Sequence, residues 1–411
     1  MHGVAETLTI ASLGHSGDGI AETAGGRVFV PYTLPGETVE IERSGERAQL
    51  LAVLATSPYW GTPACRHFGV CGNCALEHMA KPAYLAWKRT QVVAAFQQRG
   101  IDAPVEPMVP VAPGGRRRAI FSAERTAGGV VLGFHRRASP EIVAIDECAV
   151  LSPTIVGKLP LLREIAALVV QAKKPARVTV LSADNGLDVA VTGAGKLDQP
   201  LLQRLGGLAA DQALARLTID GTEVFQNRRP EIVAGGATLF PVPGGFVQAS
   251  ASAEKAMAEA VLAHVGADGP VADLFCGIGT FSLRLARRAT VTAVESDKAL
   301  LTALDQAVRR ATGTKPVTGL RRDLFANPLA PGELNRFAAV VFDPPAPGAK
   351  ALAATIAQSK VPKVVAVSCN PATLARDARI ILDGGYRLTR VLPVDQFLWS
   401  AEIEAVACFE R

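Results

Sequence analysis

The feature that most constrains the fold lies in the C-terminal part of the chain. From about Gln248 onward, apolar strands, glycine-rich turns and amphipathic helices alternate. The run 271–288, VADLFCGIGTFSLRLARR, shows one such unit. This alternation is typical of a doubly wound α/β domain, in which helices on both faces connect parallel strands. The sequence therefore predicts an α/β domain of this class over residues 246–411.

The glycine-rich turn indicates which kind of ligand this domain binds. Gly277 and Gly279 let the backbone turn tightly and approach a ligand closely. No Lys-Ser or Lys-Thr pair follows, which excludes a P-loop, and the third glycine of a dinucleotide fingerprint is missing. The next predicted strand ends at Glu295, where an acid can accept hydrogen bonds from both ribose hydroxyls of an adenosyl group. The turn and the spaced acid together predict a nucleoside cofactor.

Two more predicted strands of this domain end in side chains that can take part in chemistry. One is followed by Asp343 and two prolines, and the other is followed by Cys369. In open α/β sheets, ligands bind beyond the carboxyl ends of the strands. The glycine turn, Glu295, Asp343 and Cys369 are therefore expected at one edge of the sheet.

Cys369 stands between a predicted strand and a predicted helix. Asn370 is a good N-cap and Pro371 suits the first helical position. The helix dipole and the free backbone N–H groups would favour a thiolate at Cys369. Taken alone, the same stretch also fits a small buried thiol that only packs.

The rest of the chain predicts two further regions, because 411 residues are too many for one ordinary core. Residues 1–58 show short strands separated by Gly and Pro, which predicts a small β-barrel. Residues 59–245 begin with a cysteine-rich loop and continue as an α+β region. Residues 81–137 hold ten Lys and Arg against three Asp and Glu, the footprint expected for a polyanionic partner or for a solvated basic face.

Four cysteines in this middle region suggest a metal site. Three of them are spaced C-x5-C-x2-C and the fourth is distant: Cys65, Cys71, Cys74 and Cys148. No apolar run is long enough to cross a membrane and the start lacks the features of a signal peptide, so the expected compartment is the cytoplasm. Thiols stay reduced there and tend to be ligands or nucleophiles. The residue types leave zinc open, because His67 and His78 lie nearby.

Several motifs resemble one family over nearly the whole chain. DLFCGIGTFSL, FDPP, SCNPATLARD and DQFLWSAEIEAVACF are similar to segments of the S-adenosylmethionine-dependent RNA 5-methyluridine methyltransferases, whose catalytic domain is a Rossmann-like class I methyltransferase domain. In the N-terminal part, GDGIAE and VFVPYTLPGE resemble the TRAM (OB-like) barrel found on many members. SCNPATLARD is the most specific of these motifs, and residues 150–240 show the weakest resemblance.

The resemblance implies roles for single residues. Cys369 matches the nucleophile and Glu404 the general base. Five residues match positions that line the cofactor and base pocket: Gln248, Phe275, Thr280, Glu295 and Asp343. The pattern of three clustered cysteines and a distant one implies a [4Fe–4S] cluster held by Cys65, Cys71, Cys74 and Cys148. Because methyl transfer needs no redox step, a structural cluster is expected.

The expected activity is methyl transfer from S-adenosylmethionine to C5 of a uridine, through a covalent adduct of Cys369 at C6. The resemblance favours 23S ribosomal RNA over transfer RNA as the target, and we expect a monomer with no membrane partner. The rival prediction is a metal-containing RNA-binding protein without catalysis, but such a protein needs neither Cys369 nor Glu404. Two departures from the family pattern, Ala346 after FDPP and the pair Leu398-Trp399, bear on the choice of target.

Overall fold

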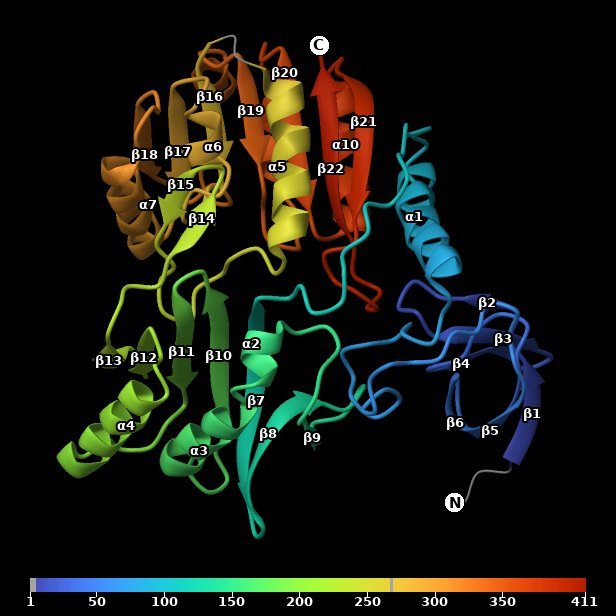
Figure 1. Ribbon diagram of the computed structural model, residues 1–411. Helices are drawn as coiled ribbons and strands as arrows, with labels where there is room; N and C mark the ends of the chain where they lie inside the picture. The colour runs from blue at the N-terminus through green and yellow to red at the C-terminus, as the bar shows by residue number, and fades with distance from the viewer. Residues whose placement is uncertain (1–4, 267–268) are drawn as a thin grey trace.

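The computed structural model describes residues 5–266 and 269–411, which form three sheet-based regions and a linking helix (Figure 1). The N-terminal region is a six-stranded sheet in the order β1-β5-β6-β4-β3-β2. Its strands are β1 (Ala5–Thr9), β2 (Ser12–Leu13), β3 (Gly19–Thr23), β4 (Gly26–Val30), β5 (Thr38–Ser44) and β6 (Arg47–Ala55).

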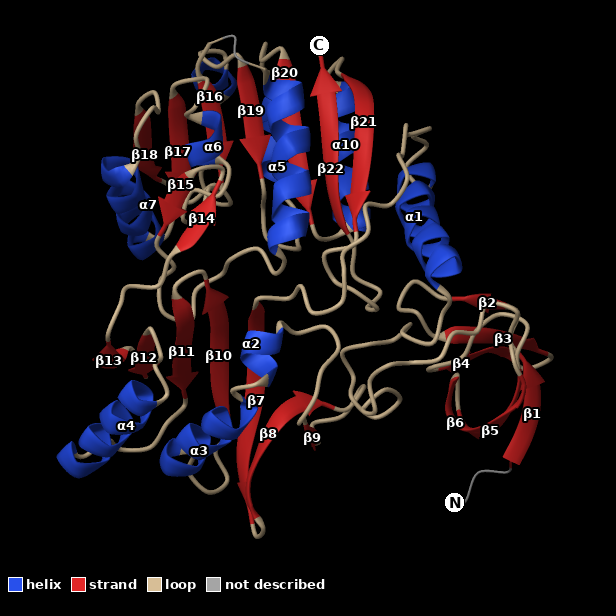
Figure 2. Cartoon of the chain, viewed as in Figure 1, coloured by secondary structure: helices blue, strands red, loops and turns tan. Residues whose placement is uncertain are grey.

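This N-terminal sheet curls around a small core of its own. β1 and β2 follow each other directly along the chain, and β1 pairs with β5 while β2 pairs with β3. The two ends of the ladder are therefore neighbouring parts of one stretch, and the sheet bends back on itself (Figure 2). Val28, Val39 and Ile41 are fully buried inside it. The strands predicted for residues 1–58 are present, and the assignment to the TRAM type stays a prediction.

The central region is a seven-stranded sheet in the order β13-β12-β11-β10-β7-β8-β9. Its strands are β7 (Arg118–Thr126), β8 (Gly129–His135), β9 (Ile142–Ala144), β10 (Ala176–Ala183), β11 (Gly186–Thr192), β12 (Arg216–Ile219) and β13 (Thr222–Gln226). All pairs are antiparallel except β11 with β12. Apolar residues of α3 (Leu159–Val169) and α4 (Gln199–Asp211) share a core with this sheet, and the short α2 (Pro153–Val156) precedes them.

The C-terminal sheet has the order β18-β17-β16-β19-β20-β22-β21, and only β22 runs against the other strands. Its strands are β16 (Val271–Leu274), β17 (Val291–Glu295), β18 (Val317–Arg321), β19 (Ala339–Phe342), β20 (Lys363–Ser368), β21 (Arg387–Val394) and β22 (Glu404–Glu410). A short hairpin precedes it, β14 (Ile232–Ala234) and β15 (Ala237–Leu239).

Helices cover both faces of this sheet, as predicted for a doubly wound domain. One face packs against α5 (Ala251–Val265), α6 (Ser282–Leu285) and α7 (Lys298–Arg310). The opposite face packs against α8 (Pro331–Leu334), α9 (Lys350–Ala357) and α10 (Pro371–Asp383). Because strand side chains alternate between faces, successive residues such as Val364 and Val365 belong to opposite cores. Both faces are apolar, which explains why these strands read as continuous apolar runs.

Helix α1 (Lys81–Gln97) packs on the C-terminal domain, although the sequence boundaries place it in the central region. Val92 and Phe96 belong to the same core as α9 and α10. After the helix, Val105 and Val109 form bridges with β21. Residues 81–109 therefore serve as an N-terminal extension of the C-terminal domain (Figure 1). Within the described ranges, none of the helices combines the length and apolar character that a membrane span requires.

Candidate active site

The glycine turn and Glu295 form the first part of the site, at the carboxyl ends of β16 and β17. Glu295 Oε2 accepts a hydrogen bond from the backbone N–H of Gly277 at 3.2 Å, and its Oε1 accepts one from the backbone N–H of Ser296 at 2.7 Å. Gly279 has φ 95°, and a Cβ there would lie 2.4 Å from Leu304 Cδ1, so only glycine fits. A Cβ on Gly277 would meet open space, which leaves room for a ligand beside the turn.

Phe275 and Thr280 flank this turn. Phe275 has φ 60°, an uncommon value for a bulky residue, and its ring lies 5.2 Å from that of Phe325. The backbone oxygen of Thr280 accepts a hydrogen bond from Arg284 at 2.9 Å. Both residues therefore lie next to the glycine turn, and their roles toward a cofactor stay predictions.

Strand register brings Cys369 and Glu404 together. β20 and β22 pair antiparallel, with Ser368 opposite Ala405. The ladder ends at this pair, and the residues that follow it on the two strands are Cys369 and Glu404, which are 35 positions apart in the chain. The Glu404 carboxyl is close enough to raise the pKa of the Cys369 thiol. The Cys369 backbone follows the strand directly, and Asn370 caps α10 through its side chain, as the sequence predicts. The nucleophile and base candidates thus meet at the carboxyl end of β20.

A chain of two amide side chains connects the two buried carboxylates of the site. Gln248 Nε2 donates to Asp343 Oδ2 at 3.1 Å. Gln396 Nε2 donates both to Gln248 Oε1 and to Glu404 Oε2, each at 2.8 Å. Gln396 Oε1 is buried and has no hydrogen-bond partner among the described residues. Sequence reasoning missed Gln396, because an amide between a strand and a loop carries no distinctive sequence signal.

The electrostatics of the site differ from the sequence expectation. Burial, with the carboxylates of Glu404 and Asp343, raises the pKa of the Cys369 thiol to about 11. Burial also raises the pKa of Asp343 to about 7 and that of Glu404 well above its ordinary value. The prediction that the helix N-terminus favours a thiolate at Cys369 is therefore wrong for the protein without ligands. Burial and two neighbouring carboxylates outweigh the helix dipole.

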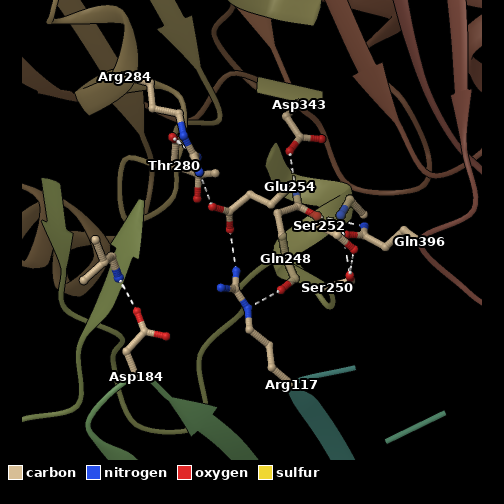
Figure 3. A network of polar contacts seen from close by, with 12 residues as sticks. Arg117, Asp184, Gln248, Ser250, Ser252, Glu254, Thr280, Arg284, Asp343 and Gln396 are labelled. Atoms are coloured by element: carbon tan, nitrogen blue, oxygen red, sulfur yellow. Dashed lines mark hydrogen bonds and ion pairs between the residues drawn. The ribbon is translucent and has the colours of Figure 1, made fainter. Parts of the chain in front are cut away.

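An arginine from the central region supports this chain of side chains (Figure 3). Arg117 Nε donates to the backbone oxygen of Gln248 at 3.0 Å, and its guanidinium also binds Glu254 at 2.5 Å. Arg284 binds the other carboxylate oxygen of Glu254 at 2.7 Å. Arg117 is only 8% exposed. It joins the central and C-terminal domains. The charge pattern had suggested a residue that faces RNA, but the Arg117 side chain is buried between the two domains.

Other basic residues of this zone are also engaged within the protein. Arg118 donates to the backbone oxygens of residues 244 and 245, and Arg136 pairs with a neighbouring glutamate. Arg137 binds Asp18 at 2.6 Å and thereby holds the N-terminal sheet against the central region. Most basic side chains of this zone therefore bind other parts of the protein. The positive surface left for a polyanionic partner is smaller than the local charge suggests.

A cavity of about 1200 Å³ lies where the three regions meet. Its lining includes His15 from the N-terminal region, Arg116 and Arg118 from the central region, and Asn370 and Pro371 next to Cys369. This cavity reaches the edge of the site from the side of the cysteine loop. Its lining ends at the residues that directly follow Cys369, so the cavity lies beside the site.

The four clustered cysteines line this same cavity. Burial raises the pKa of all four thiols, and neighbouring thiols of the group add to the shift for Cys65, Cys71 and Cys74. Across residues 5–266 and 269–411, however, no three His, Cys, Asp or Glu side chains are arranged to hold a metal ion. The side-chain arrangement therefore does not support the predicted iron–sulfur cluster.

The zinc alternative is not supported either. His67 Nε2 lies 2.7 Å from Asp146 Oδ1. His78 is fully buried between the rings of Phe68 and Trp60, and burial lowers its pKa to about 4. Within the described parts of the chain, neither ring nitrogen of His78 has a hydrogen-bond partner. Neither histidine completes a four-ligand site with the cysteines.

Comparisons with known proteins agree on one type of enzyme. An uncharacterized RNA methyltransferase of Brucella suis is 50% identical over 404 residues, covering 98% of this chain and 97% of that protein. The 23S rRNA (uracil(1939)-C(5))-methyltransferase RlmD of Alkalilimnicola ehrlichii is 33% identical, with 98% and 96% covered. No model of a known protein family matches the chain.

One solved structure shares the whole architecture. The tRNA (uracil-54, C5)-methyltransferase of Pyrococcus abyssi, in complex with S-adenosyl-L-homocysteine, superposes with a TM-score of 0.76 at 20% identity. The match covers 99% of this chain and 100% of that one. At this identity the likeness concerns the fold, and it includes the N-terminal, central and C-terminal regions together.

Proposed function

The chain belongs to the family of RNA methyltransferases that includes the RlmD enzyme of Alkalilimnicola ehrlichii, and from this premise we propose that it methylates C5 of a uridine in RNA. The methyl donor is S-adenosylmethionine. The observation that carries the proposal is the pairing of β20 with β22, which sets Cys369 beside Glu404. An RNA-binding protein without catalysis has no use for this pair, so the rival prediction is disfavoured.

We propose the following roles for the reacting side chains. Cys369 Sγ forms a bond to C6 of the uracil, and the electron pair displaced from the C5–C6 double bond makes C5 nucleophilic. C5 would then form a bond to the electrophilic methyl carbon of bound S-adenosylmethionine, while the bond from that carbon to the sulfonium sulfur breaks, its electron pair stays on sulfur and S-adenosylhomocysteine leaves. Glu404 then accepts the proton from C5, the double bond re-forms, and Cys369 leaves with the electron pair of the C–S bond.

The raised pKa of Cys369 has a consequence for the order of binding. At neutral pH, the thiol of the protein without ligands is protonated, because its burial, together with the neighbouring Glu404 and Asp343, disfavours the thiolate. The methyl donor carries a positive sulfonium, which would oppose these carboxylates and lower the pKa of the thiol. We therefore infer that Cys369 becomes more nucleophilic when the methyl donor is in place.

The cofactor residues predicted from the sequence fit an adenosyl group at the glycine turn. Glu295 is held by backbone N–H groups with its carboxylate at the end of β17, where it can accept hydrogen bonds from ribose hydroxyls. The open space beside Gly277 would receive the ligand, with Phe275 and Thr280 on either side. Gln248 and Asp343 would line the end of the pocket that reaches Cys369.

We propose that the four clustered cysteines hold a [4Fe–4S] cluster. It is supported by four cysteines from two distant segments sharing one cavity, and by the resemblance in their spacing. The side chains as described would have to rearrange to bind it. No step of the reaction proposed above involves the cluster.

For the target we propose 23S ribosomal RNA, because the RlmD relative acts there and matches nearly the whole chain. A transfer RNA is the second candidate, because the Pyrococcus enzyme shares the complete architecture. The N-terminal sheet would act as a TRAM domain, and the enzyme would be a cytoplasmic monomer. Mapping 5-methyluridine in both RNAs from a strain lacking the gene separates the two targets.

The reaction itself is tested with RNA that carries 5-fluorouridine. Fluorine cannot leave C5 as a proton, so the wild-type enzyme should form a protein–RNA adduct that survives denaturing electrophoresis. The adduct should require S-adenosylmethionine and contain one transferred methyl group. If no adduct forms although labelled methyl groups enter normal RNA, the covalent mechanism is wrong.

A further inference from the structure

Helix α1 carries two polar side chains that the proposed reaction does not use, yet both are fully buried. Tyr84 is 1% exposed and Lys88 is 0% exposed. Both point at Asp395, which is also 0% exposed. Tyr84 Oη donates to Asp395 Oδ1 at 2.7 Å, and Lys88 Nζ donates to the same oxygen at 2.6 Å. A buried cluster of this kind between distant segments calls for an explanation.

The cluster holds the segment that leads to the catalytic base. Asp395 directly precedes Gln396, whose amide binds Glu404 and Gln248. Lys88 Nζ makes a second hydrogen bond, to the backbone oxygen of Phe397 at 2.9 Å. Two residues of α1 therefore fix both sides of Gln396 along the chain.

Trp399, four residues after Asp395, shows that the backbone of this segment is strained. Its φ is 59°, which is a genuine outlier for a bulky residue. Its backbone N–H donates to Tyr84 Oη at 2.7 Å. Its backbone oxygen accepts hydrogen bonds from the N–H groups of Ala75 and Leu76 at 2.8 and 3.0 Å. Such strain persists only where the surroundings over-determine it, and it concentrates at functional sites.

We propose that Tyr84, Lys88 and Asp395 are positioning residues for the methyl-transfer reaction: they hold residues 395–399 so that Gln396 can orient Glu404 toward C5 of the uracil. The backbone of Ala75 and Leu76, which follows Cys74, supports the same segment from the other side. The proposal rests on the proposed function, because it assigns a purpose to the placement of its base.

Stability alone is a poor explanation for this cluster. A buried ion pair must offset the cost of removing two charges from water, and apolar side chains of similar volume often do as well or better. Here Tyr84 and Lys88 both donate to Oδ1 of Asp395, while its Oδ2 has no partner within the described residues. The arrangement holds the Asp395 carboxylate in one orientation but leaves one of its oxygens without a hydrogen bond.

The test uses Tyr84→Phe, which removes one hydroxyl and keeps the ring. We expect methyl transfer to proceed while release of the C5 proton slows about tenfold, a part of the 10²–10⁴ that a general base typically contributes. The methylated protein–RNA adduct should therefore accumulate on normal RNA, as measured by denaturing electrophoresis and by tritium release from [5-³H]uridine RNA. Affinity for S-adenosylmethionine should not change.

Tyr386→Phe is the matched control. Tyr386 is 4% exposed and donates to the backbone oxygen of Val361 at 2.8 Å. It directly precedes β21, whereas Asp395 directly follows this strand, so the two residues lie at opposite ends of it. Its loss removes a comparable buried hydrogen bond far from Glu404. If Tyr84→Phe and Tyr386→Phe show the same ratio of proton release to methyl transfer, the cluster has no positioning role.

Lys88→Met/Asp395→Leu separates positioning from folding. With both charges gone, the protein should fold with a thermal midpoint close to that of the wild type. It should nevertheless accumulate the methylated adduct. A folded double variant with the wild-type ratio overturns the proposal, and if it does not fold, Tyr84→Phe decides. Failure of the proposed function is recognised separately, because the wild type would then form no adduct with 5-fluorouridine RNA.

Discussion

Cys369 and the four clustered cysteines are all largely buried thiols, but different kinds of structure hold them in place. Cys369 follows a central strand, and the register of β20 with β22 determines its partner Glu404. The four others lie in irregular segments, with Cys65, Cys71 and Cys74 in one loop and Cys148 after β9. Burial raises the pKa of thiols in both places.

The difference shows how the surroundings decide what a thiol can do. Cys369 has two carboxylates beside it, so a cationic ligand would shift its pKa toward reactivity. The clustered thiols have mainly each other and Glu77, so a metal would be the natural counter-charge, although the side chains do not converge on one. The comparison therefore predicts that Cys369 reacts with the substrate, whereas the cysteine loop has a structural role.

The largest expected effect is that of Cys369→Ala. Without the thiol nothing adds to C6, so methyl transfer should fall to the limit of detection, measured as label from S-adenosylmethionine entering RNA. Cys408→Ala is the control, because Cys408 is 0% exposed on β22 of the same sheet and faces the core. It should lower the thermal midpoint by a few degrees through a small cavity and retain activity. Substantial activity in Cys369→Ala would leave Cys369 as a packing residue.

Glu404→Gln should have the next largest effect, and of a different kind. The amide cannot accept the C5 proton, so turnover should fall by about 10²–10⁴ while one methyl group per enzyme is still transferred. A methylated adduct should accumulate, visible by denaturing electrophoresis and absent when Cys369 is also replaced. Glu410→Gln, at the other end of β22, should behave as the wild type. Turnover at the wild-type rate in Glu404→Gln would place the base elsewhere.

The C-terminal fold and its site edge could be predicted from the sequence because regular elements fix them. Strand, turn and helix alternate with clear boundaries, and side chains after parallel strands meet at one edge. The location of Cys369 and Asp343 at this edge follows from their positions alone, and their roles stay predictions. Glu404 could be singled out only by the family resemblance, because a carboxylate at the start of a strand is usually exposed and carries no distinctive sequence signal. The structure shows that Glu404 is buried.

The parts that sequence could not predict depend on contacts between distant segments. Arg117 reads as one charge in a basic run, but it is buried against Glu254 of the C-terminal domain. Lys88 also reads as one charge in this basic zone, but Asp395, over 300 positions away, pairs with it in the interior. Net charge and helical spacing carry no information on such partners. The pKa of Cys369 was misjudged for the same reason.

Cys148→Ser should have a smaller effect on the reaction and tests the other side of the comparison. If the loop binds a cluster, wild-type protein purified without oxygen should contain about four iron and four sulfide ions, and the variant should lose them. Turnover should fall only about tenfold, because the loop supports the site and supplies no reacting atom. The variant should still form the 5-fluorouridine adduct. Wild-type protein with neither iron nor sulfide would remove the cluster proposal altogether.

The smallest expected effect concerns the charge around Cys369, probed by the rate at which iodoacetamide modifies this thiol. Because the pKa of Cys369 is about 11, the rate should rise close to tenfold for each pH unit between pH 7 and 10. At pH 8, S-adenosylmethionine should raise the rate about tenfold, equal to a shift of one pKa unit, because its sulfonium opposes Glu404 and Asp343. S-adenosylhomocysteine fills the same space without the charge and should not raise it. Equal rates with both ligands would mean that the methyl donor does not activate the thiol and that deprotonation must come from the RNA-bound state.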